Sequence, residues 1–171
     1  MAGAIKGAAK DYLYKWTETP VGRLKLVASK DGLAAILWED DRPGRVRLNI
    51  VAEAQDHPIL LETERQLRDY FAGARKVFDI ELDFAGTDFQ KKVWAALLAI
   101  PFGETRTYAE ISRQLGSPKA VRAVGAANGR NPISIIAPCH RVVGSGGELT
   151  GFAGGLEVKA RLLGLEGAPA R

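Results

Sequence analysis

The sequence lacks the cysteines and histidines that disulfide-bonded or metal-bound scaffolds need. It contains one cysteine and two histidines in 171 residues, so it cannot form an internal disulfide or a multi-thiolate metal site. No apolar run reaches the length of a membrane span, and the first ten residues lack the apolar core of a secretory signal peptide. We therefore expect a cytoplasmic protein of a reducing compartment, with no membrane association and no bound metal.

Negative charge is scarce in the second half of the chain. Residues 87–171 hold 11 Lys/Arg and 6 Asp/Glu, whereas residues 1–86 hold 13 and 14, so the net charge of +4 comes from the second half. A basic surface favours a polyanionic partner such as nucleic acid. The hydrophobic content of 46% and the charged content of 26% are typical of a globular protein, and the length allows one ordinary domain or two small ones.

Residues 1–84 have the pattern of a small mixed domain of strands and one helix. Alternating apolar residues and turn signals such as Asp31-Gly32 favour strands, and a helical pattern that opens at His57-Pro58 stops at Gly73. The expected elements are strands over 12–17, 24–28, 33–38 and 77–84, a surface loop over 40–47 and a helix over 57–73.

The hydrophobic period changes after Ala85-Gly86, which marks a second, mostly helical domain over 85–171. Two capping-box patterns, at Thr87 and at Thr107, each predict the start of a helix. Ser117, followed by a proline, is expected to cap the next helix. The predicted fold class is therefore α+β, a mixed domain followed by a helical one.

Two short predicted helices on either side of Gly116 have the pattern of a helix-turn-helix. The outer face of the second helix carries Arg122 among the small residues Gly125, Ala126 and Gly129. Such a face can approach a nucleic-acid backbone closely but has few long polar side chains to read base edges, so it predicts sequence-independent binding. The alternative is that the small residues pack against another helix.

The lone cysteine, Cys139, lies in the run Pro138-Cys139-His140-Arg141, next to one of the two histidines. Most lone cysteines are buried and inert. A cysteine whose proton is drawn off by a nearby base is instead a strong nucleophile. Composition alone favours the inert cysteine, and the surrounding residues reverse that preference.

The second half carries a series of motifs in a fixed order. They are Thr87-Asp88-Phe89-Gln90-x-x-Val93-Trp94, Ile100-Pro101-x-Gly103-x-Thr105, Thr107-Tyr108, Ala123-Val124-Gly125-Ala126-Ala127-Asn128, Asn131-Pro132-Ile133, Ile136-x-Pro138-Cys139-His140-Arg141-Val142 and Gly151-x-Ala153-Gly154-Gly155. With these motifs the sequence resembles the O6-alkylguanine-DNA alkyltransferases, also called methylated-DNA–protein-cysteine methyltransferases. The resemblance extends more weakly over the first half, through Thr19-Pro20-Val21-Gly22 and Leu67-x-x-Tyr70-Phe71-Ala72-Gly73. We expect similarity to the stand-alone bacterial members, because no cysteine-rich amino-terminal sensor domain is present.

The resemblance implies direct-reversal DNA repair. An alkyl group on O6 of guanine, and on O4 of thymine, would pass to Cys139 in one irreversible reaction after the base has been flipped out of the duplex, and no cofactor would be needed. The implied partner is double-stranded DNA bearing O6-alkylguanine, bound by a monomer through the minor groove and largely without sequence preference. The implied folds are RNase H-like for the first domain and winged-helix-like for the second.

The resemblance also implies roles for particular residues. His140 would be the base, acting through a water molecule, Glu166 would orient it, and Asn131 would tie the helix-turn-helix to the active-site segment. Tyr108 would crowd the target phosphate and give a proton to the departing guanine, and Arg122 would enter the base stack in place of the flipped nucleotide. Further DNA contacts are implied for Ala123, Ala126, Asn128 and Arg130, and a guanine pocket lined by Val142, Phe152, Ala153 and Gly154.

The chain departs from some relatives in two respects. Ala153 stands where some members have serine, which removes one hydrogen bond to O6 and implies a different alkyl or inhibitor preference. Some members bind zinc in the first half, but His57 is the only histidine there and the half has no cysteine, so a structural zinc is not expected.

Simpler interpretations of single residues, and two other functions, stay open from the residues alone. Tyr108 can be a core residue, Glu166 a solvated carboxylate, and Arg122 a phosphate contact. A cysteine hydrolase with Cys139, His140 and Glu166 as its triad would need an oxyanion site and would turn over repeatedly. A DNA-binding regulator or lesion sensor would need no nucleophile, and non-catalytic relatives usually lack the acceptor cysteine.

Overall fold

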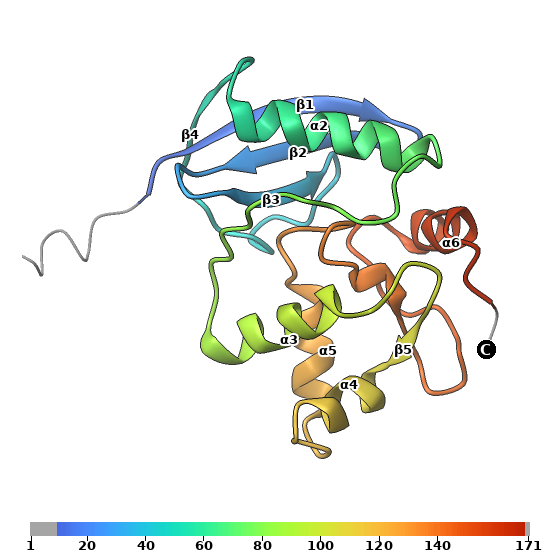
Figure 1. Cartoon of the computed structure of the whole chain (residues 1–171). Coiled ribbons are helices and arrows are strands. Elements are labelled where there is room, and N and C mark those ends of the chain that lie inside the picture. Colours follow the sequence, from blue (N-terminus) through green and yellow to red (C-terminus); the bar gives the residue numbers. More distant parts are fainter. Residues whose placement is uncertain (1–9, 170–171) are drawn as a thin grey trace, which may run out of the picture.

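A four-stranded sheet forms the amino-terminal half in the computed structural model, which describes residues 10–169 (Figure 1). The strand order is β3-β2-β1-β4, and the strands are β1 (Tyr12–Thr19), β2 (Gly22–Ala28), β3 (Leu33–Trp38) and β4 (Ile50–Glu53). The first three strands pair antiparallel, whereas β4 runs parallel to β1. The first three predicted strands are confirmed, whereas β4 was not predicted from the sequence.

Helix α2 (Pro58–Phe71) packs on one face of this sheet (Figure 1). The imidazole Nδ1 of His57 caps it by accepting a hydrogen bond from the backbone N–H of Ile59 at 3.2 Å. Its buried face contributes Leu60, Leu67 and Tyr70 to a core shared with the strands. The predicted helix is therefore confirmed, and it ends just before Gly73, whose φ of 79° few other residues adopt.

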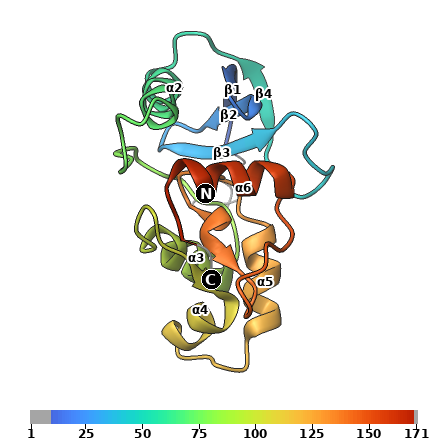
Figure 2. The same ribbon diagram turned by 90° about the vertical axis from the view of Figure 1, so that its right-hand side faces the viewer.

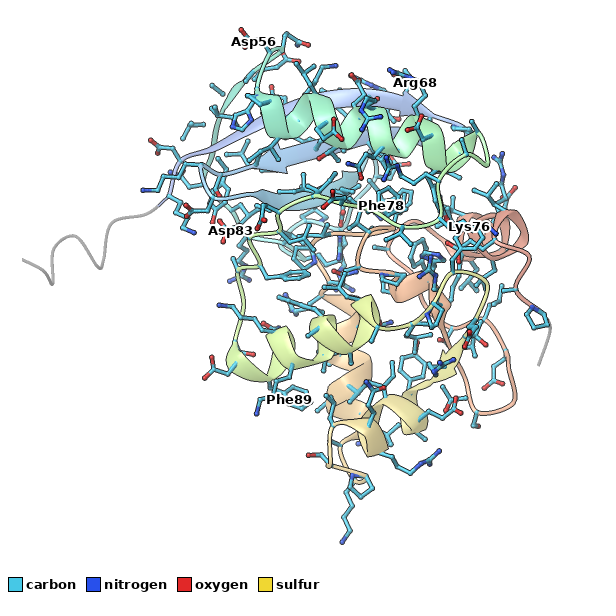
Figure 3. The ribbon with its side chains drawn as sticks, in the orientation of Figure 1. Asp56, Arg68, Lys76, Phe78, Asp83 and Phe89 are labelled. Carbon is cyan, nitrogen blue, oxygen red and sulfur yellow. The ribbon has the colours of Figure 1, made fainter. Side chains whose placement is uncertain are left out.

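The predicted strand over 77–84 is wrong. This segment forms one isolated parallel bridge, between Leu33 and Leu82, held by Leu33 N–H to the Glu81 carbonyl and Asp83 N–H to the Leu33 carbonyl, both at 2.8 Å. Figure 3 shows Phe78 and Asp83 on this segment, at the level of β3. Phe78, Ile80, Leu82 and Phe84 pack on the core, so their alternation reflects burial rather than a strand.

The carboxy-terminal half is mostly helical. Its elements are α3 (Asp88–Leu98), β5 (Arg106–Thr107), α4 (Tyr108–Gln114), α5 (Val121–Gly129), a 3-10 turn η1 (Cys139–Arg141), β6 (Val142–Val143) and α6 (Leu156–Leu165). Both predicted capping boxes are present, at Thr87 and at Thr107. The predicted cap at Ser117 is wrong, because α5 begins at Val121, after Ala120, and has no side-chain cap.

The segment that follows α5 joins the helical half to the edge of the sheet. Ile36 of β3 forms a parallel bridge with Ile133, and its N–H donates to the Pro132 carbonyl at 2.9 Å. Ile135 and Ala137 belong to the same core as β2, β3 and α2. Figure 2 shows β3 as the strand nearest the helical half, with α6 directly beside it. The α+β fold is thus confirmed, and the chain leading to Cys139 is anchored on the sheet.

Within residues 10–169, no helix is long and apolar enough to cross a membrane.

Candidate active site

Residues 131–138 form a buried segment between α5 and η1. Asn131 closes it into a turn: its amide Nδ2 donates to the Ala137 carbonyl at 2.7 Å, and its Oδ1 accepts from Ile133 N–H at 3.0 Å. Ile135 has φ 74°, a conformation that costs energy for a β-branched residue and persists only where the surroundings enforce it. Asn131 thus connects the end of α5 with the active-site segment, which is the place that the resemblance implies for it.

Cys139 begins the 3-10 turn and is 5% exposed. Burial raises the pKa of its thiol, because the thiolate loses hydration, and this effect is larger than those that favour the thiolate. Those opposing effects come from the Asn131 side chain, from the positive charges of Arg45 and Lys159, and from the Ser134 hydroxyl. The thiol is therefore protonated at rest and needs a base before it can act as a nucleophile.

His140 and Glu166 form a buried pair next to this thiol. The imidazole Nε2 lies 2.8 Å from Glu166 Oε2, and both side chains are 0% exposed. The other ring nitrogen, Nδ1, is buried and has no hydrogen-bond partner within the part of the chain that the structure describes. Burial lowers the pKa of His140, against the opposing effect of Glu166. A neutral imidazole with one free nitrogen, oriented by a carboxylate, is the arrangement of a general base.

Glu166 is held by two further side chains. Its Oε2 accepts a hydrogen bond from the Tyr70 hydroxyl at 2.6 Å, and Arg141 donates to Oε1 at 2.8 Å and to Oε2 at 3.0 Å. Burial would raise the pKa of Glu166, but the hydrogen bonds from His140 and Arg141 outweigh it and lower the pKa to about 2. The carboxylate is therefore charged at neutral pH, in a position where it stabilises a protonated His140.

Two buried cations face the active-site segment. Lys159 of α6 is 0% exposed, and its Nζ donates to the Val142 carbonyl at 2.6 Å and to the Thr150 carbonyl at 3.2 Å. Burial lowers the pKa of Lys159 to about 8, although Cys139 acts in the opposite direction. Arg45 donates to the carbonyls of Gly129 at 3.2 Å and Asn131 at 2.8 Å, and pairs with Asp41. The predicted surface loop over 40–47 thus contains a buried arginine.

A cavity of about 480 Å³ opens between the helical half and the loop after β3. Tyr108, Gly125, Phe152 and Ala153 line it, and the Tyr108 hydroxyl hydrogen-bonds Thr150 Oγ1 at 2.5 Å. Tyr108 and Phe152 also pack on the apolar cluster that contains Cys139 and Val142. Tyr108, Phe152 and Ala153 thus line one cavity, and Tyr108, Val142 and Phe152 share an apolar cluster with Cys139, while Gly154 lies against Trp38.

The outer face of α5 is exposed and carries Arg122, Ala123 and Ala126. Asn128 does not share this face, because it is 5% exposed on the buried side of the helix with Val124 and Ala127. Arg130 follows the helix and is exposed, with its Nη1 3.4 Å from the carbonyls of Gly44 and Arg45. The exposed face of α5 thus carries small side chains around Arg122, as the sequence predicts. Asn128, for which a DNA contact was expected, faces the core instead.

Sequence reasoning missed several side chains of this site. Lys159 and Arg45 belong to no motif, whereas Tyr70 and Arg141 lie within motifs of the resemblance that assign them no role. Each acts through a partner far away in the sequence, so only the folded chain reveals it. Among residues 10–169, no group of three or more His, Cys, Asp or Glu side chains could hold a metal ion.

The fold and the site together define a protein in which two short helices, α4 and α5, are arranged as in a helix-turn-helix. A buried cysteine follows in the chain, next to a histidine that pairs with a glutamate. Family models match both halves: residues 12–84 match the ribonuclease-like domain of 6-O-methylguanine DNA methyltransferase, and residues 88–168 match its DNA-binding domain. The chain therefore belongs to the methylated-DNA–protein-cysteine methyltransferase family. The exact domain boundary, between residues 84 and 85, stays a prediction.

Relatives of that name match most of the chain. The protein from Mycobacterium tuberculosis H37Rv is 61% identical over 90% of this chain and 91% of its own, and that from Methanosarcina acetivorans is 47% identical over 91% and 98%. The crystal structure of Mycobacterium tuberculosis OGT in complex with DNA superposes with a TM-score of 0.78, covering 94% of this chain and 96% of the other at 45% identity.

Proposed function

We propose that this protein repairs DNA by moving the alkyl group of O6-alkylguanine onto its own Cys139. The observation that carries the proposal is the placement of the only cysteine directly beside the buried His140–Glu166 pair, whose contact is 2.8 Å long. The family of the chain supports the same reaction. O4-alkylthymine presents a similar alkyl ether and belongs to the same proposal.

The first step is ionisation of the thiol. The proton of Cys139 passes through a water molecule to His140, whose Nδ1 is buried and free of protein partners within residues 10–169. Glu166 stabilises the imidazolium because its pKa of about 2 keeps it charged. The positive charges of Lys159 and Arg45 favour the thiolate that results.

The second step is displacement at saturated carbon. The Cys139 sulfur forms a bond to the alkyl carbon, the bond from that carbon to O6 breaks, and the electron pair stays on the guanine. Tyr108 gives a proton to the guanine as it departs. The phenolate left on Tyr108 takes up a proton from water, and the His140 imidazolium releases the proton of the thiol to water, so charge and protons balance. A thioether is a poor leaving group, so one protein molecule repairs one lesion, and no cofactor takes part.

The substrate reaches Cys139 only if the damaged nucleotide leaves the stack. The cavity beside Tyr108, Phe152 and Ala153 is the proposed site for the flipped base. Arg122 is proposed to take the vacated place in the duplex, with the small residues Ala123 and Ala126 allowing the exposed face of α5 to approach the minor groove. We further expect a monomer, located in the cytoplasm, that binds without sequence preference.

The decisive measurement is the intact mass after incubation with a duplex bearing one O6-methylguanine. We expect a gain of one methyl group on Cys139, at most one per protein molecule, and none in Cys139→Ala, which should still bind the duplex. Repeated turnover would instead favour a cysteine hydrolase. Full transfer activity in Cys139→Ala would contradict the assignment of the acceptor, and binding without any mass change in the wild type would favour a lesion sensor.

A further inference from the structure

Trp38 connects the amino-terminal sheet with the active-site half of the molecule. It is the last residue of β3, the strand nearest the helical half (Figure 2), and it is 6% exposed. Its backbone is fixed by a turn in which its N–H donates to Asp41 Oδ2 at 3.2 Å and its carbonyl accepts from Asp41 N–H at 3.1 Å. The indole therefore projects from a rigid base.

The indole contacts two segments of the proposed site at once. Its Nε1–H donates to Ser134 Oγ at 3.1 Å, within the buried segment that leads to Cys139. Its ring packs edge-on against Phe152, with centroids 5.4 Å apart and an interplanar angle of 68°. A Cβ added at Gly154 would lie only 2.8 Å from the indole. The loop that carries Phe152 therefore packs closely against Trp38, and Phe152 has little free space in the direction of the indole.

Phe152 is also a wall of the cavity beside Tyr108. The same cavity is lined by Asp40 and Arg42, in the loop that follows β3. One wall of the cavity is therefore the Phe152 ring, which packs against Trp38 of the sheet. Asp40 and Arg42 of the amino-terminal domain form another part of its lining. A bulky O6 group that extends toward this side of the cavity would have to displace Phe152, and Trp38 stands behind it.

We propose that Trp38 is a positioning residue that sets the width of the alkyl pocket, and thereby makes the protein favour small O6 adducts over bulky ones. The inference rests on the proposed function, because the cavity must receive the flipped base. It gives the amino-terminal sheet a part in substrate selection, although that sheet carries no catalytic side chain. Loosening the support of Phe152 should help a bulky adduct and do little for a methyl group.

The test compares two substrates on the same protein preparation. Single-turnover transfer to Cys139 is measured with duplexes bearing O6-methylguanine or O6-benzylguanine, for the wild type, Trp38→Phe and Trp38→Leu. Trp38→Phe removes the indole N–H but keeps a ring, whereas Trp38→Leu removes the ring as well. We expect the benzyl-to-methyl rate ratio to rise by about tenfold in Trp38→Leu and by less in Trp38→Phe.

The benzyl-to-methyl rate ratio separates a change in pocket width from a general loss of activity. An unfolded fraction, or a change in thiol ionisation passed on through Ser134, slows both reactions alike and cancels. The matched control is Trp16→Phe, a tryptophan of β1 whose ring contacts are Arg23 and Lys25, and its ratio should equal that of the wild type. Free O6-benzylguanine should also react faster with Trp38→Leu, since no duplex is needed to enter a wider pocket.

The outcomes distinguish this inference from the function on which it rests. Transfer by the wild type with an unchanged ratio in both Trp38 variants overturns the role of Trp38 and leaves the proposed function intact. The same rise in Trp16→Phe would also overturn it. A wild type that transfers neither group to Cys139 overturns the proposed function, and the role of Trp38 with it.

Discussion

Charged side chains are buried around Cys139 in a number that stability alone does not explain. Arg45, Arg141, Lys159 and Glu166 are all less than 10% exposed, and burying a charge costs free energy that an apolar residue of similar size would not. Each is paired with a carboxylate, a carbonyl or the imidazole. We interpret this network as the means by which the site moves one proton and holds one thiolate.

Lys159 provides a test of this interpretation. Its ammonium favours the thiolate of Cys139, so Lys159→Met should raise the pKa of that thiol and slow transfer roughly ten- to a hundredfold at neutral pH. Because the pKa of Lys159 is about 8, the lysine is charged below that pH and neutral above it. The difference between wild type and variant should therefore be largest below pH 8 and shrink above it. Methyl-transfer rates measured against pH check this.

The control for Lys159→Met is Lys119→Met, the same change at an exposed lysine between α4 and α5. It should leave the pH–rate profile unchanged. A folded Lys159→Met protein whose profile matches that of the wild type would rule out an electrostatic role and leave Lys159 as a donor to two carbonyls.

At the residue scale, the sequence pointed to the proposed nucleophile and its partners but missed the buried charges around them. Cys139, His140 and Glu166 were expected from a motif and a resemblance, and the structure brings them together. Lys159 and Arg45 were not expected, because what makes them important is a carbonyl or a thiol on another element. The residues that flank a buried cation in the sequence form no distinctive pattern, so its burial cannot be predicted from them.

Helix α4 is the element on which the orientation of Tyr108 depends. Tyr108 is its first residue, and the helix is only seven residues long, so its capping box supplies much of its order. Thr107 Oγ1 accepts from Glu110 N–H at 3.1 Å, while Glu110 Oε1 accepts from Thr107 N–H at 2.7 Å. Loss of this cap should therefore affect both stability and chemistry.

Thr107→Ala should lower the free energy of unfolding by about 1 kcal/mol and slow methyl transfer several-fold. Thr87→Ala removes the equivalent cap of α3, where Gln90 N–H donates to Thr87 Oγ1 at 3.1 Å, and should cost similar stability without slowing transfer. Denaturant unfolding and single-turnover rates check the pair. Equal effects of the two changes on transfer would show that α4 does not orient a reacting group.

At the element scale, what could be predicted depended on whether the signal was local. Capping boxes act within four residues, and both predicted ones are present at Thr87 and Thr107. A strand needs a partner elsewhere: residues 77–84 alternate like a strand yet form one bridge, whereas the mostly exposed β4 forms a ladder with β1. Ser117 has the residue type of a cap, but the helix begins four residues later.

At the scale of the molecule, the two halves share one functional site. The sheet edge at Ile36 holds the segment that leads to Cys139, Tyr70 of α2 holds Glu166, and Arg45 holds the end of α5. The helical half supplies Cys139, His140 and the exposed face of α5. Side chains of both halves therefore hold the residues of this site in place.

Arg122 tests how the whole molecule engages DNA, because it lies on the exposed face of α5, apart from the buried network. If it replaces the flipped nucleotide in the stack, Arg122→Ala should slow transfer from duplex O6-methylguanine by about tenfold or more and leave the reaction with free O6-benzylguanine unchanged. Arg161→Ala removes another exposed arginine, on α6, which donates to the Pro20 carbonyl, and should change neither rate.

Equal losses on duplex and free base would mean that Arg122 supports the fold of the site. A loss confined to duplex, together with a salt dependence of binding weaker by about one phosphate contact, would place the arginine on the backbone instead of in the stack.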